Sequence, residues 1–198
     1  MTGVSHLRWI LVVEKEATFK ALVERGFHQH PVVGPGLLVT AKGYPDLATR
    51  YFLRFLLDNA HTPIQIFGLF DWDPDGIMIL KCYLYGSKNL AQEHCSIVPE
   101  MRWIGVKAED ITTLGHAHGE LLPLSMRDRA IAASMLASEE WRNDTGEMLP
   151  GLQEGIADLQ RMLMLGRKAE IQILGYGDDG IEPWLVKKLR NGLEHRGL

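Results

Sequence analysis

The sequence has little of what marks several specialised protein classes. Only two of its 198 residues are cysteines, Cys82 and Cys95, and they do not form a CxxC pair. This spacing indicates neither a disulfide framework nor a zinc site, and it fits a reducing compartment. No run reaches the ~18 continuous apolar residues of a membrane helix, and no signal-peptide pattern opens the chain. We therefore expect no membrane partner.

An excess of basic charge is also missing. The chain has 21 Lys and Arg residues against 25 Asp and Glu residues, which gives a formal net charge of −4. This balance excludes nucleic-acid binding driven by total charge, although a local basic patch remains compatible with it. Repeats and low-complexity tracts are absent as well. The length and the ordinary globular composition predict one domain, or one domain with an appendage.

Strand and helix patterns alternate in the first half of the chain. Apolar, β-branched runs predict strands, and apolar residues at helical spacing predict helices between them. The expected strands are 7–13, 37–40, 64–70 and 101–106, and the expected helices are 17–25, 46–59 and 76–84. Connections of this length join parallel strands through right-handed crossovers. The fold class predicted is α/β, with a Rossmann-like core of four parallel strands and flanking helices.

The sequence also predicts which face of the helix at 46–59 is buried and which is exposed. Its apolar face is expected to consist of Leu47, Tyr51, Phe52, Phe55 and Leu56. Arg50 and Arg54 are expected on the outer face.

The second half of the chain reads as mainly helical. Residues 108–120 are polar and predict a loop, whereas helical patterns follow at 125–137, 147–166 and 182–193. Residues 169–174 fit either a helix end or a short strand. We therefore expect a core at 1–110 and a mainly helical region at 111–198 that packs on it, so that the whole forms a single compact unit.

Acidic residues follow two of the predicted strands. The third strand ends in Asp71, Asp73 and Asp75, spaced by two residues, and Glu14 ends the first strand. Carboxyl ends of parallel strands lie at one edge of the sheet, where ligands bind. Two carboxylates ~4 Å apart repel by ~1 kcal/mol in water and ~4 kcal/mol at an effective dielectric constant of 20. A cation relieves this repulsion, so the pattern predicts a Mg²⁺ site, with Mn²⁺ also possible, formed by Glu14, Asp71 and Asp73. Asp75 is either a further ligand or an N-terminal cap of the next helix.

Four motifs in order carry a family resemblance. They are Val12–Phe19, Lys42–Leu53, Asp71–Ile77 and Tyr85–Ser87. Together they resemble the Toprim domain of the eukaryotic Spo11 proteins, which are related to the A-type chain of topoisomerase VI. Glu14, Asp71 and Asp73 match the metal-binding positions of that family.

The resemblance implies a function in meiotic DNA double-strand breakage. In that family a tyrosine of a winged-helix domain attacks a DNA phosphodiester, and the Toprim domain of a second copy supplies Mg²⁺. This sequence contains no such winged-helix segment, so we expect the chain alone not to cleave DNA. The implied partners are DNA, a second copy of the chain, other meiotic break-forming proteins and a topoisomerase VI B-like subunit. The implied location is the nucleus.

Five basic residues are candidates for contact with DNA phosphates. They are Lys42, Arg50, Arg54, Lys81 and Lys88.

Two other functions fit the acidic motif. One is a haloacid-dehalogenase-like Mg²⁺ phosphatase, with Asp71 as the nucleophile and Asp178–Asp179 as its later acidic motif. The other is a non-catalytic dimerisation or docking module whose acids have only a structural role.

Overall fold

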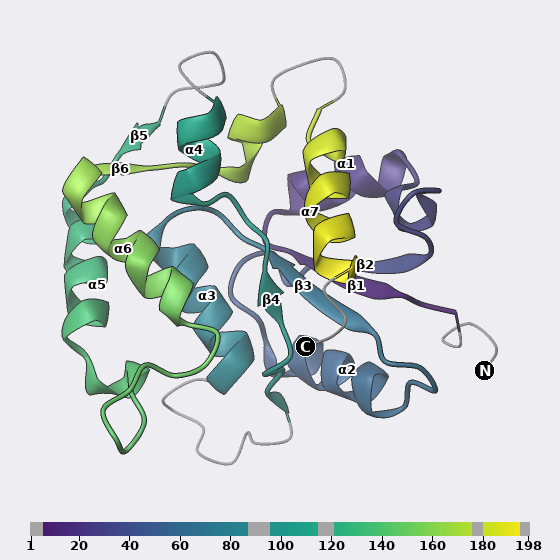
Figure 1. Cartoon of the computed structure of the whole chain (residues 1–198), viewed down its shortest axis with the longest axis horizontal. Coiled ribbons are helices and arrows are strands. Elements are labelled where there is room, and N and C mark those ends of the chain that lie inside the picture. The colour runs from purple at the N-terminus through teal and green to yellow at the C-terminus, as the bar shows by residue number, and fades with distance from the viewer. Residues whose placement is uncertain (1–5, 87–95, 115–120, 176–179, 195–198) are drawn as a thin grey trace.

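A four-stranded parallel sheet lies at the centre of the molecule (Figure 1). The computed structural model describes residues 6–86, 96–114, 121–175 and 180–194. The strands are β1 (Trp9–Val13), β2 (Gly36–Val39), β3 (Gln65–Leu69) and β4 (Arg102–Trp103), in the order β2-β1-β3-β4. All five residues of β1 are buried, as expected of a strand covered on both faces of a parallel sheet. The predicted α/β fold with four parallel strands is confirmed.

Three helices connect the strands and follow the expected order. They are α1 (Glu16–Glu24), α2 (Leu47–Asp58) and α3 (Pro74–Tyr85). Pro74 occupies the first turn of α3, where its missing N–H leaves no bond unmade. Each helix begins just after a strand ends, so the first turns of the three helices gather at the carboxyl edge of the sheet.

The orientation of α2 differs from the prediction. Leu53 and Leu56 face the core, but Tyr51, Phe52 and Phe55 are exposed. Arg50, predicted on the outer face, is 2% exposed. The apolar residues of this helix cover a broad arc, and only the part with Leu53 and Leu56 faces inward, so their spacing did not identify the buried face.

The fourth strand is shorter than predicted. It contains two residues that pair with Phe67 and Gly68 of β3. Just beyond it, a Cβ added to Gly105 would meet the backbone oxygen of Phe70 at 2.2 Å. The chain therefore passes close to the end of β3 at Gly105, where no larger residue would fit.

The second half is mainly helical, with several departures from the prediction. Its helices are α4 (Ala108–Leu114), α5 (Met126–Ala137), α6 (Gln153–Leu165) and α7 (Glu182–Glu194), with 3₁₀ turns η4 (Glu139–Trp141) and η5 (Ile171–Gly175); an earlier turn, η1 (Phe27–Gln29), follows α1. The helix predicted at 147–166 begins only at Gln153, and a 3₁₀ turn lies at 171–175, where a helix end or a short strand was predicted at 169–174. A loop was predicted where α4 begins, but Asp110 accepts a hydrogen bond from Lys107 N and caps that helix. Strands β5 (Leu122–Pro123) and β6 (Arg167–Lys168) form a second, antiparallel sheet that the sequence did not reveal.

One apolar core joins both halves of the chain. Fully buried residues of the sheet region, such as Phe67 and Trp72, belong to the same cluster as Leu159 of α6 and Leu185 of α7. Helices α5 and α6 pack beside α3, while α7 lies on the other side next to β3 and β4 (Figure 1). Within the described ranges, no helix combines the length and the apolar character needed to cross a membrane.

Candidate metal centre

Glu14 and Asp71 meet at the carboxyl edge of the sheet although 57 positions separate them. Strands β1 and β3 are neighbours, with Val13 opposite Leu69. The register continues beyond the strands, because Glu14 N donates to Leu69 O at 3.1 Å. The Glu14 side chain then accepts a hydrogen bond from Asp71 N at 2.9 Å. Two segments that are distant in sequence thus meet at one edge of the sheet, through the Glu14 carboxylate and the backbone of Asp71.

Asp71 is the most buried acid of the cluster, at 4% exposed. Its Oδ1 accepts a hydrogen bond from Ile171 N at 2.8 Å, and its Oδ2 lies 3.0 Å from the ammonium group of Lys15. The adjacent Trp72 exchanges two backbone hydrogen bonds with Ala169. The segment around β6 and η5 therefore forms one wall of the acidic site, which no local sequence pattern indicated.

Asp73 connects the site to α3. Its Oδ1 accepts a hydrogen bond from Gly76 N at 2.7 Å, so Asp73 is the N-cap of the helix. Its Oδ2 lies 4.0 Å from Lys168 Nζ. Gly76 allows the close approach of helix and strand end, since a Cβ there would lie 2.3 Å from Asp71 O.

Asp75 is turned toward other partners. It accepts a hydrogen bond from the Tyr44 hydroxyl at 2.8 Å and lies 2.9 Å from Arg127. Of the two roles predicted for Asp75, capping of α3 is wrong, because Asp73 caps that helix. Asp75 instead ties the β2–α2 loop to the start of α5.

Burial raises the pKa of all three predicted ligands. The pKa of Glu14 rises to about 7, first through burial and then through the nearby charge of Asp71. Burial also raises the pKa of Asp73 to about 6, against the Gly76 N–H bond that lowers it. The pKa of Asp71 is raised too, again mainly by burial. Acids that are poorly solvated and close together bind a divalent cation readily once they are ionised.

The donor chemistry of the cluster fits Mg²⁺. One oxygen of each of Glu14, Asp71 and Asp73 accepts a backbone N–H, which fixes the carboxylate. The second oxygens of the two Asp residues lie near Lys15 and Lys168. Mg²⁺ is usually held by one or two carboxylates and keeps several waters. The side chains are not arranged as a complete ligand cage: in the described part of the chain, no three His, Cys, Asp or Glu residues are grouped to hold a metal.

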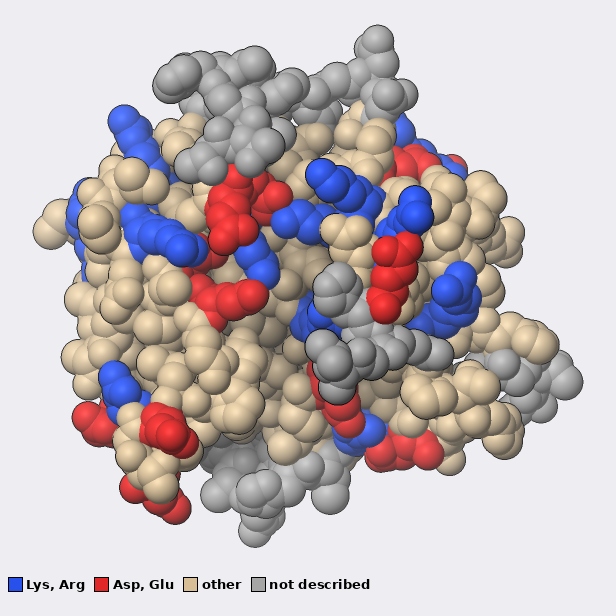
Figure 2. All heavy atoms as spheres, in the orientation of Figure 1, with Lys and Arg blue, Asp and Glu red and all other residues tan. Residues whose placement is uncertain are grey.

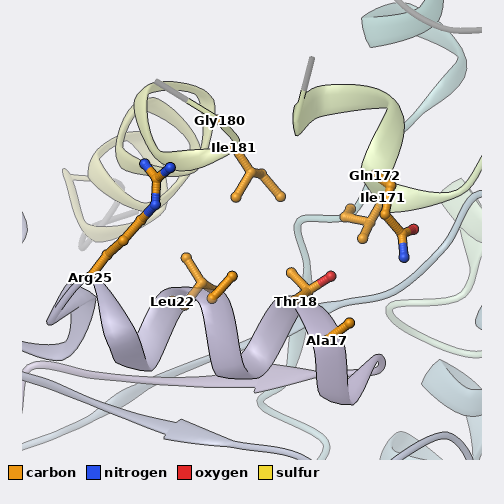
Figure 3. Close-up of a pocket in the computed structure, with 9 residues that line it drawn as sticks. Ala17, Thr18, Leu22, Arg25, Ile171, Gln172, Gly180 and Ile181 are labelled. Carbon is orange, nitrogen blue, oxygen red and sulfur yellow. The ribbon is translucent and has the colours of Figure 1, made fainter. Parts of the chain in front are cut away.

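A cavity of about 470 Å³ adjoins this site (Figure 3). It lies between α1 and the segments that contain η5 and the start of α7, and it is mostly apolar. Ile171 and Gln172 belong both to its wall and to the acidic site, through Asp71 and Lys15 respectively. The acidic site and the cavity therefore share part of one wall.

Four of the five predicted DNA-contacting residues lie in the described part of the chain, and those four do not form one patch. Lys42 is exposed at the rim of the site, 3.4 Å from Glu16, whereas Arg50 is buried. Arg54 pairs with Asp58 and Glu100. Lys81 pairs with Glu140 and lies over the ring of Trp141, and Lys88 falls outside the described residues. Basic and acidic side chains are interspersed on the face shown in Figure 2.

Three basic residues beside the acids were missed by the sequence analysis. Lys15 and Lys168 each lie within 4.0 Å of an Asp of the cluster, and Arg127 is exposed next to Asp75. Lys15 could have been identified from the sequence, because it directly follows Glu14. Lys168 and Arg127 reach the site only through the packing of the second half, so no local signal marked them.

Comparison with known proteins gives the family. Residues 9–187 match the family of Toprim domains found in Spo11 and in the A-type chain of topoisomerase 6. The chain belongs to this family. The matched region crosses residue 110, so it includes most of the helical second half as well as the parallel sheet.

Curated relatives of this Toprim domain include meiotic recombination proteins and "DNA topoisomerase 6 subunit A3" of Oryza sativa subsp. indica. The chain is 36% identical to "Meiotic recombination protein SPO11-2" of Oryza sativa subsp. indica over 190 residues, which is 95% of this chain and 45% of that protein. It is 36% identical to "Meiotic recombination protein rec12" of Schizosaccharomyces pombe, with 86% and 44% covered. For "Meiotic recombination protein SPO11" of Homo sapiens, the identity is 38%, with 67% and 33% covered. The chain thus spans less than half the length of these relatives.

Proposed function

We propose that this chain is the metal-binding Toprim part of a Spo11-like protein that makes meiotic DNA double-strand breaks by tyrosine transesterification. Glu14, Asp71 and Asp73 would hold the Mg²⁺, or Mn²⁺ in its place. The observation that carries the proposal is the meeting of Glu14 and Asp71 at the carboxyl edge of the sheet, where Asp71 N donates a hydrogen bond of 2.9 Å to the Glu14 carboxylate. Membership of the family of Spo11 Toprim domains also supports a metal-binding role for these acids.

Each acid would have a distinct part in such a site. Bound Mg²⁺ neutralises charge on a phosphate during its transfer. Asp71 is held by Ile171 N and cannot turn away without breaking that bond. Asp73 holds its orientation as the cap of α3. Asp75 is left out of the ligand set, since Tyr44 and Arg127 already bind its carboxylate.

Lys42 and Arg127 are the basic residues best placed to contact the DNA backbone. Both are well exposed, with side-chain exposures of 64% and 69%. Lys42 follows β2 in the loop that docks on β1 through a hydrogen bond from Gly43 N to Glu14 O. Arg127 contacts Asp75 and Lys42 contacts Glu16. Each exposed cation therefore contacts an acid that lies two positions along the chain from a proposed metal ligand.

The remaining parts of the proposed function rest on the family. By resemblance, the attacking tyrosine lies in a winged-helix domain outside this chain, so the chain alone is expected not to cleave DNA. We expect it to act in the nucleus as a homodimer, together with other meiotic break-forming proteins and a topoisomerase VI B-like subunit. Sedimentation of the purified chain tests the dimer.

Metal binding provides the direct test of the site. Calorimetry with Mn²⁺ or Mg²⁺ should show weak binding to the chain, and Asp71→Asn or Glu14→Ala should abolish it. Asp144→Asn is the matched control, because Asp144 is exposed in the turn between η4 and α6. Equal binding by the wild type and by both site variants would refute the proposal. In the full-length protein, Asp71→Asn should abolish DNA breakage while circular dichroism shows an unchanged fold.

A further inference from the structure

Lys15 occupies an unusual place, between the acidic site and the second half of the chain. It follows Glu14 directly and is the N-cap residue of α1. Its ammonium group lies 3.0 Å from Asp71 Oδ2, 3.0 Å from Glu170 Oε2 and 3.1 Å from Gln172 Oε1. One cation is therefore shared between an acid of the predicted metal site and two side chains of another segment.

The Asp71 oxygen that contacts Lys15 is the one that a metal would need. Asp71 Oδ1 is used by Ile171 N, so Oδ2 is the remaining oxygen. An ammonium group at hydrogen-bond distance and a divalent cation cannot both contact that oxygen without strong repulsion between them. One of the two has to leave when the other binds.

We propose that Lys15 is a built-in counter-ion that competes with the divalent metal for Asp71, and that Glu170 and Gln172 keep its ammonium group when the metal binds. The proposal rests on the metal site proposed above. Without metal, Lys15 offsets the charge of a carboxylate that is 4% exposed. With metal, it stays on the two partners it already contacts, and no large movement of the chain is needed.

Lys168 does not share this role. Its ammonium group lies 3.0 Å from Asp128 and 4.0 Å from Asp73, so its main partner is outside the proposed ligand set. Asp128 is itself fixed as part of the capping box of α5. Lys168 can therefore remain in place when a metal binds, whereas Lys15 cannot keep its contact with Asp71.

The test compares metal affinity and metal-free stability in four forms of the 198-residue chain. Lys15→Met removes the competing charge, Lys15→Arg keeps it, and Lys20→Met removes an exposed lysine of α1 that contacts Glu16. Calorimetry with Mn²⁺ should give an affinity about tenfold higher for Lys15→Met than for the wild type. Lys15→Arg and Lys20→Met should remain close to the wild type. In EDTA, Lys15→Met should melt at a lower temperature than Lys20→Met, because Asp71 loses its counter-ion.

Asp71→Asn, measured in parallel, separates this proposal from the metal site itself. If Asp71→Asn binds Mn²⁺ as the wild type does, the metal site is wrong and the counter-ion proposal falls with it. If Asp71→Asn abolishes binding but Lys15→Met binds no more tightly than the wild type, only the counter-ion proposal is overturned. Binding by Lys15→Met with none by the wild type would support competition. Absence of binding in every form would overturn both proposals.

Discussion

At the scale of single residues, burial sets the behaviour of the acidic site. Glu14 and Asp73 sit where the sheet meets the first turns of helices, and desolvation raises the pKa of each. A protonated carboxyl group does not bind Mg²⁺, so metal affinity should rise with pH through the range from about 6 to about 7. The metal-free protein should show the opposite trend in stability.

The stability of the metal-free chain should fall as pH rises toward neutrality. Glu14 has a pKa of about 7 in the fold against an ordinary value of 4.5. Between these values the folded state keeps a proton that the unfolded chain has lost, so the free energy of unfolding decreases with rising pH. Glu14→Gln should remove this part of the decrease, as followed by thermal melts in EDTA from about pH 5 to about pH 8. Its amide oxygen can still accept the Asp71 N–H.

Glu24→Gln controls for the loss of one negative charge, because Glu24 is exposed at the end of α1. An identical pH slope in the wild type and in Glu14→Gln would contradict the assigned burial effect.

At the scale of elements, the site depends on how closely α3 approaches the end of β3. Gly76 lies in the first turn of α3, and a Cβ there would overlap the backbone oxygen of Asp71. The contact is with backbone, so a side-chain rotation cannot relieve it. The glycine of the acidic motif therefore has a packing role.

Gly76→Ala should destabilise the chain by about 1–3 kcal/mol, as forced overpacking does. It should also weaken Mn²⁺ binding, since the backbone of Asp71 must shift. Urea unfolding and calorimetry measure the two effects. Gly155→Ala in α6 is the control, because its Cβ would meet a side-chain carbon of Ile77 at 3.0 Å and no backbone. Equal stability of the two variants would show that the approach of α3 is not tight.

At the scale of the whole molecule, contacts from the second half of the chain hold the sheet and the acidic site of the first half in place. Ile171 N holds Asp71, and Ala169 pairs with Trp72 through two backbone hydrogen bonds. On the other side of the sheet, Gly192 of α7 packs against the ring of Phe67. Each of these contacts joins a residue before position 110 to one after it.

Residues 1–110 alone should therefore not fold cooperatively. The fragment would expose Phe67 and Trp72, which are fully buried in the chain, and would leave Asp71 Oδ1 without its bond from Ile171 N. Thermal melts followed by near-ultraviolet circular dichroism should show one sharp transition for the 198-residue chain and none for the fragment. A cooperative melt of the fragment would mean that the core is stable without its helical region.

The order of elements and the position of the acids along them follow from local patterns in the chain. Alternation of strand and helix patterns indicated the parallel sheet, and a carboxylate that follows a buried strand has to emerge at its carboxyl edge. Glu14, Asp71 and Asp73 could be selected on that ground, because strand direction and side-chain alternation are local properties.

The surroundings of those acids and the buried face of α2, in contrast, became visible only in three dimensions. Lys168 and Ile171 reach the site through contacts about 100 residues apart in sequence, for which no local pattern exists. Arg50 is buried while Phe55 is exposed, because the neighbours of α2, and not its own spacing of apolar residues, select its inner face. The strands alone place the acids at the edge of the sheet. Long-range packing then determines how deeply those acids are buried and which charged groups lie beside them.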